Sequence, residues 1–118
     1  MKHDDLRERT KAFALAVISF TETLPRTRKA DVLGRQLLRS GTSVGANYRA
    51  ACRARSQADF IAKMGIVEEE ADESGYWMEL LLDSGTVKPD SLSALKVEAD
   101  ELVAIAVASI KTARKGNR

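Results

Sequence analysis

The 118-residue chain has few of the residues that interrupt or cross-link a fold. Its one cysteine, Cys52, excludes a disulfide within the chain and fits a reducing compartment. Two prolines and seven glycines leave room for long uninterrupted helices. No apolar run approaches the length of about 20 residues that crosses a membrane. We therefore expect a cytoplasmic protein without a membrane partner.

Groups for catalysis are also scarce. The single histidine, His3, excludes the paired Glu-x-x-His motifs of di-iron bundles. Cys52 has no histidine partner, and Ser40 and Ser43 lack the nearby base that activates a nucleophile. The glutamates at 68–70 point in three directions on a helix, so they cannot converge on one metal ion. We expect no enzymatic activity, no metal and no cofactor.

The chain does contain helical periodicity. Apolar residues recur at three- and four-residue spacing in four segments, and no segment shows the alternation of a strand. The predicted boundary residues are Asp5, Thr27 and Ser56 as N-caps, Pro25 as a stop, Gly85 as a C-terminal glycine and Pro89 as a first-turn proline. The sequence predicts one all-α domain over 1–118, an antiparallel up-down-up-down bundle with helices at about 5–24, 28–55, 57–83 and 89–114.

The second segment has four chemically distinct sides when it is placed on a helical wheel. The four sides are a core stripe (Leu33, Leu37, Val44, Tyr48, Ala51), small residues (Gly34, Gly41, Gly45, Cys52), a basic sector (Arg35, Arg39, Arg49, Arg53) and a polar stripe (Gln36, Ser40, Ser43, Asn47). A loop would hardly separate residues into four sides of a helical wheel in this way. In addition, G-T-S-V-G-A-N-Y at 41–48 lacks the Lys-Ser/Thr ending of a phosphate-binding loop. We predict a helix with one face of small residues for close packing.

Charge is segregated along the chain. Residues 25–58 carry eight Lys and Arg against Asp31 alone, a net charge of +7, whereas residues 59–88 carry two against eight acids, a net charge of −6. Two interpretations stay open: the basic and acidic helices pair with each other, or the basic helix binds nucleic acid. In the second case the candidate binding residues are Arg35, Arg39, Arg49, Arg53 and Arg55.

The third segment has two apolar stripes. The first, predicted as core, contains Phe60, Met64, Val67, Ala71, Met78 and Leu81. The second contains Ile66, Trp77 and Leu80, with Glu70 and Glu73 among them. A helix of a monomeric bundle needs only one buried face, so the second stripe predicts a subunit interface. The alternative is a wide flank of the core with Trp77 half exposed.

Two stretches resemble a known family: Q-L-L-R-S-G-T-S-V-G-A-N-Y-R-A-A-C-R-A-R-S at 36–56 and D-F-I-A-K-M-G-I-V-E-E-E-A-D-E-S-G-Y-W-M-E-L-L at 59–81. They are similar to the proteins encoded in 23S rRNA intervening sequences and to the related accessory variability proteins of diversity-generating retroelements. The sharpest part of the match is Gln36, Leu37, Ser43 and Asn47. Ala50 departs from the glutamate that is common in the family at that position.

The resemblance implies a four-helix bundle that assembles into a ring-like homopentamer and has no catalytic activity. It attributes nucleic-acid binding to the retroelement branch. We therefore expect a homo-oligomer that binds RNA or other structured nucleic acid through the basic helix. The alternative is a scaffold or accessory subunit for another protein, with the basic helix paired internally.

Overall fold

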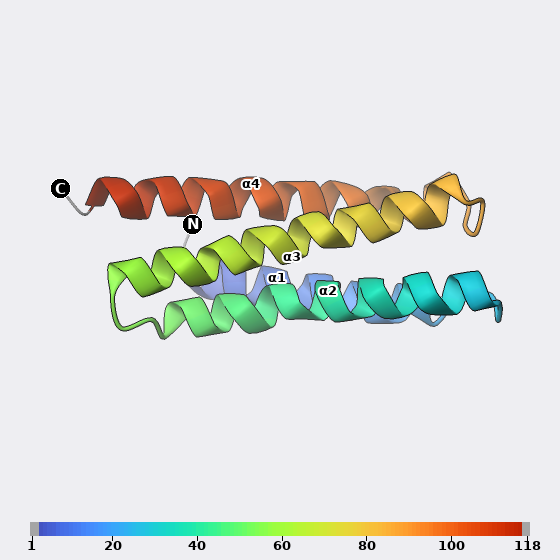
Figure 1. Cartoon of the computed structure of the whole chain (residues 1–118), viewed down its shortest axis with the longest axis horizontal. Helices are drawn as coiled ribbons and strands as arrows, with labels where there is room; N and C mark the ends of the chain where they lie inside the picture. The colour runs from blue at the N-terminus through green and yellow to red at the C-terminus, as the bar shows by residue number, and fades with distance from the viewer. Residues whose placement is uncertain (1–2, 117–118) are drawn as a thin grey trace.

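The computed structural model describes residues 3–116, with side chains from Asp5 onward. They form α1 (His3–Thr21), α2 (Arg28–Cys52), α3 (Gln57–Asp83) and α4 (Ser93–Gly116), with a short 3-10 helix η1 (Pro89–Ser91) before α4. The four α-helices run up, down, up and down along a body of 51 × 21 × 19 Å (Figure 1). The predicted all-α bundle is confirmed within this range. Residues 1–2 and 117–118 of the predicted domain lie outside it.

Local signals fix most helix ends. The hydroxyl of Thr27 accepts a hydrogen bond from Ala30 N, and that of Ser56 accepts one from Asp59 N, so both predicted N-caps are confirmed. Gly85 has a φ of 71°, and the N–H of Thr86 donates to Leu81 O at 3.1 Å. This left-handed residue ends α3 as predicted, because glycine adopts the conformation without a steric cost.

Other helix ends differ from the prediction. α1 stops at Thr21, before the predicted end at Leu24, because both the N–H and the hydroxyl of Thr23 bind the carbonyl of Phe20. Asp5 lies inside α1, so its predicted role as N-cap is wrong. The remaining differences are that α2 ends at Cys52 instead of 55 and that α4 begins at Ser93 after the 3-10 turn at Pro89.

The core runs the length of the bundle. It includes Phe13, Val17, Leu37, Val44, Met64, Val67, Met78, Leu81, Leu92 and Leu102, all almost fully buried. The predicted core stripes of the second and third segments are confirmed, except that Leu33 and Phe60 are only half-buried and pack against its edge. Two buried hydroxyls, Ser40 on α2 and Ser74 on α3, meet at 3.0 Å within this apolar region. Their hydrogen bond satisfies groups that would be costly to bury alone.

Small residues bring α1 and α2 close together. A Cβ atom added to Gly41 would lie 2.9 Å from Val17 Cγ2, and one added to Gly45 would lie 3.2 Å from Thr10 Oγ1. Near the connecting turn, a Cβ atom added to Gly34 would lie 2.7 Å from Leu24 Cδ1. We call this contact line the α1–α2 seam. The predicted role of the small-residue face is therefore confirmed for these three glycines.

An ion pair joins the first and last helices. Arg9 on α1 donates from Nε and Nη2 to the two carboxylate oxygens of Glu98 on α4, at 2.7 and 2.8 Å, and Nη2 also donates to Glu101 at 3.1 Å. These hydrogen bonds raise the pKa of Arg9 above its usual value, led by the contact with Glu98. α1 shares a much smaller interface with α4 than with α2. The ion pair is therefore a prominent part of the α1–α4 contact.

Two glycine substitutions test the seam. Gly41→Ala should lower the free energy of unfolding by about 1 kcal/mol, because the clash with the stiff Val17 outweighs the gain in helix propensity. Gly65→Ala is the matched control on α3, where an added Cβ meets nothing within 4 Å. It should raise stability by up to about 1 kcal/mol. Urea denaturation measures both, and equal gains would contradict close packing at Gly41.

Candidate nucleic-acid interface

All five predicted nucleic-acid-binding arginines are exposed, but they differ in their partners. Arg35 Nε lies 3.1 Å from a carboxylate oxygen of Asp31, one turn earlier on α2. This pair lies at the surface, where such contacts contribute little to stability. Arg35 is thus partly neutralised by its own helix while its side chain remains in solvent.

Arg39 crosses from α2 to α3. Its Nη1 lies 3.2 Å from Glu70 Oε2, and its Nη2 forms an ion pair with Glu73. Glu73 also accepts a hydrogen bond at 3.0 Å from the indole Nε1 of Trp77. Glu70 and Glu73 therefore accept hydrogen bonds from an arginine of the neighbouring helix. At this position the basic and acidic helices do pair internally.

Arg49 and Arg53 have no such partner. Arg49 lies in the last turn of α2 and Arg53 directly follows the helix; both side chains are exposed, and neither makes a hydrogen bond or ion pair with any side chain in the described part of the chain. Arg55 lies in the following turn near Asp59. The pKa of Asp59 is lowered mainly by a hydrogen bond from Lys63 and in smaller part by Arg55. The C-terminal end of α2 is therefore the part of the basic sector with uncompensated charge.

The polar stripe of α2 lies along its contact with α3. Ser40 is buried against Ser74, Ser43 Oγ donates to Arg39 O at 2.7 Å, and Asn47 Nδ2 donates to Ser43 O at 2.8 Å. Gln36 Oε1 accepts a long hydrogen bond of 3.4 Å from Arg39 Nε. These polar groups bind mainly the backbone of α2 and each other. They support the arrangement of the helices and expose little hydrogen-bonding capacity.

The second apolar stripe of α3 lies at the surface. Ile66 is 40% exposed, while Trp77 and Leu80 are half-buried, and Trp77 packs against the edge of the core. The ring of Tyr76, which is 53% exposed, meets Trp77 edge-on with centroids 5.2 Å apart. Sequence reasoning assigned no surface role to Tyr76. The stripe thus forms a partly exposed apolar surface, and the Arg39–Glu70–Glu73 ion pairs lie beside it.

A basic groove lies between α1 and α2, and the sequence analysis did not find it. The groove has a volume of about 460 Å³ and is lined by Arg7, Glu8, Thr10, Lys11 and Ala14 of α1 and by Thr42, Gly45, Ala46 and Arg49 of α2. Arg7 and Lys11 are four residues apart, which places them on one side of α1. That spacing was the available signal, but only the fold shows that they face Arg49.

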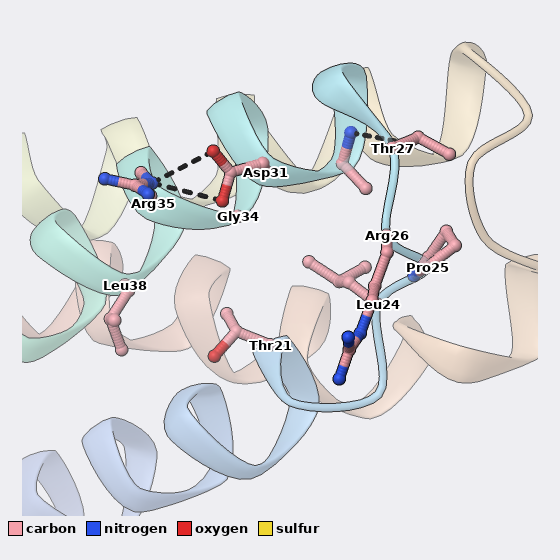
Figure 2. Close-up of a pocket in the computed structure, with 10 residues that line it drawn as sticks. Thr21, Leu24, Pro25, Arg26, Thr27, Asp31, Gly34, Arg35 and Leu38 are labelled. Carbon is pink, nitrogen blue, oxygen red and sulfur yellow. Dashed lines mark hydrogen bonds and ion pairs between the residues drawn. The ribbon is translucent and has the colours of Figure 1, made fainter.

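A second hollow lies at the other end of the same two helices, where the chain turns from α1 to α2. Figure 2 shows Arg26 extending from the turn toward the last turn of α1, beside Leu24, while Arg35 and Asp31 are paired on α2. The hollow has a volume of about 420 Å³ and ends at Gly34 and Leu38. Basic side chains therefore occur at both ends of the α1–α2 seam.

The described residues also limit the chemistry. Between 5 and 116, no three His, Cys, Asp or Glu side chains come together as metal ligands would. None of the described helices has a stretch long and apolar enough to cross a bilayer.

The comparisons with known proteins agree with this architecture. The family model described as "23S rRNA-intervening sequence protein" matches residues 2–108. A crystal structure of a protein of unknown function from the S23 ribosomal protein family of Bacteroides thetaiotaomicron superposes with a TM-score of 0.87. Its sequence is 34% identical, over 94% of this chain and 99% of that chain. No curated protein matches the chain. The chain belongs to the 23S rRNA-intervening sequence protein family.

Two single substitutions separate the arginines. Arg39→Gln should lower the melting temperature, because it leaves Glu70, a side chain only 16% exposed, without its cation. The free energy of unfolding should fall by about 0.5–1 kcal/mol, since the side chains of the ion pair are partly exposed to solvent. Arg49→Gln removes the same charge from a side chain without an ion pair and should leave the melting temperature unchanged. Equal effects in calorimetry would contradict the different environments of the two arginines.

Proposed function

We propose that this protein is a non-catalytic homo-oligomer that binds RNA through the basic surface of α2. The observation that carries the proposal is the pair Arg49 and Arg53, two exposed guanidinium groups four residues apart with no acidic partner among the described side chains. Phosphate contacts from such groups supply most of the affinity in sequence-independent binding. The resemblance to the accessory proteins of retroelements agrees with this role.

The charge segregation supports both binding and internal pairing, at different residues. Arg39 is engaged by α3 and contributes mainly to the bundle. Arg49, Arg53 and Arg55 extend the basic surface beyond the acidic part of α3. We therefore assign the predicted RNA contact to the C-terminal half of α2, with Arg35 as a further contributor at the opposite end. The scaffold function remains the alternative, favoured by the Arg39–Glu70–Glu73 network.

RNA binding is tested with a labelled RNA hairpin and fluorescence anisotropy over a range of salt. The wild type should bind at low salt, and Arg49→Gln/Arg53→Gln should bind less tightly. The slope of log affinity against log salt should flatten by about one for each lost phosphate contact. Lys88→Gln/Lys111→Gln is the control, because it removes the same charge at two other exposed positions. A wild type that ignores the hairpin at low salt would refute RNA binding and leave the scaffold function.

The proposed assembly, a pentamer, uses the second apolar stripe of α3. Ile66, Trp77, Leu80 and the neighbouring Tyr76 expose more apolar surface than one helix of a closed monomer needs. Burying such a surface contributes about 25 cal/mol per Å². The oligomer would also repeat the basic end of α2 around its axis and multiply the phosphate contacts available to one RNA.

Light scattering tests the assembly. The wild type should be an oligomer at micromolar concentration, and Trp77→Ala should dissociate it. Because Trp77 also packs against the core, Ile66→Gln is the second variant, which changes only the exposed part of the stripe. Val97→Gln is the control, since Val97 is 56% exposed on α4, away from the stripe. A monomeric wild type would refute the proposal, and unchanged variants would move the interface elsewhere.

A further inference from the structure

The groove formed by the N-terminal half of α1 and the C-terminal half of α2 is lined by more cations than anions. Arg7, Lys11 and Arg49 surround it, and Glu8 is the one acidic residue in its lining. None of the three cations makes an ion pair with a described side chain, whereas Arg9, two residues after Arg7, is paired with Glu98 and Glu101 of α4. Three uncompensated cations around one concave site favour an anionic ligand.

The floor of the groove is made of small side chains. Ala14, Gly45 and Ala46 line the groove together with the cations, and Thr10 and Thr42 line it too. These hydroxyls bind backbone carbonyls, Thr10 that of Arg7 at 3.2 Å and Thr42 that of Leu38 at 2.7 Å. A ligand can therefore approach the helix surfaces closely while long cationic side chains reach it from both sides.

The residues of the groove offer no aromatic platform for base stacking. None of its lining residues is aromatic, and the one exposed ring among the described residues, that of Tyr76, lies on α3 instead. Proteins that hold unpaired bases use aromatic platforms for them. A groove of cations and small residues instead matches the sugar-phosphate backbone, which carries charge but no sequence information.

The basic residues continue along the seam. Arg49 in the groove and Arg35 beside the turn-end hollow are 14 residues apart on α2, which is about 21 Å along the helix axis. One strand of a DNA duplex carries a phosphate about every 3.4 Å of helix axis, so a distance of this order along a nucleic acid spans several successive phosphates. Arg26 lines the turn-end hollow together with Arg35 (Figure 2).

We infer that the α1–α2 groove is a phosphodiester-backbone site, in which Arg7 and Lys11 of α1 bind RNA together with Arg49 of α2. The inference rests on the proposed function and deepens it, because it adds a second helix to the RNA surface and assigns the kind of contact. Because contacts to phosphates carry no sequence information, we expect binding at this site to depend little on base sequence.

The test compares four variants, including Arg49→Gln/Arg53→Gln from the test above, with labelled oligo(U), oligo(A) and a mixed-sequence hairpin of equal length. Arg7→Gln/Lys11→Gln should weaken binding about tenfold at 0.1 M salt and flatten the salt slope by about two. The loss should be the same for oligo(U) and oligo(A). Ala46→Met fills the floor with a good helix former and no change of charge, and it should also weaken binding. Lys111→Gln/Arg114→Gln, on α4, is the control for net charge and should have a smaller effect.

The outcomes separate the two proposals. The first outcome is that the wild type binds RNA, that Arg49→Gln/Arg53→Gln weakens this binding, and that Arg7→Gln/Lys11→Gln behaves like the α4 control. In that case the inferred RNA site in the groove is overturned, and the proposed function stands. A clear preference between oligo(U) and oligo(A) that Arg7→Gln/Lys11→Gln abolishes would overturn the backbone assignment. A wild type that binds none of the probes overturns both. Circular dichroism confirms that each variant keeps its helical content, so that lost binding is not lost folding.

Discussion

The close approach of α1 and α2 is the constraint on which the surface of this bundle depends. Gly41 leaves no room for a side chain opposite Val17, and Gly45 leaves little room opposite Thr10, so these two side chains of α1 lie directly against the backbone of α2. That approach lets Phe13 and Val17 share one core with Leu37 and Val44. It also keeps the outer side of the seam shallow and brings basic residues of two helices to the edges of one groove.

The basic sector of α2 spans enough of the helix circumference to face both α3 and α1. Arg39 and Arg49 are ten residues apart, which places them about 80° apart around the helix axis. That difference directs Arg39 toward α3, where Glu70 and Glu73 receive it, and Arg49 toward α1, whose nearby residues include Arg7 and Lys11. The opposite charges of the second and third helices are therefore neutralised along one side of α2 only.

The sequence predicted the fold well because four long periodic segments and short breaks leave few ways to bury the apolar stripes. Thr27, Ser56 and Gly85 act locally, so their roles could be inferred from single residues. The ends at Thr21 and Cys52 depend on how the chain turns into the next helix, which local patterns do not specify. The groove could not be predicted for a related reason. Arg7 and Lys11 form no recognisable pattern on α1 alone, and they line a basic groove only together with Arg49, which lies 38 or more residues away in the sequence.

The contact between α1 and α4 has a consequence for how the bundle forms. The extensive interfaces join helices that follow each other in the chain, so they close short loops and can form early. The hydrogen bonds between Arg9 and Glu98 join residues 89 positions apart. Closing a loop of this length costs more conformational entropy than closing the short loops between consecutive helices, and the α1–α4 interface is small. Opening this edge leaves α1 packed on α2 and α4 packed on α3, so we expect the α1–α4 contact to open more readily than the other three interfaces.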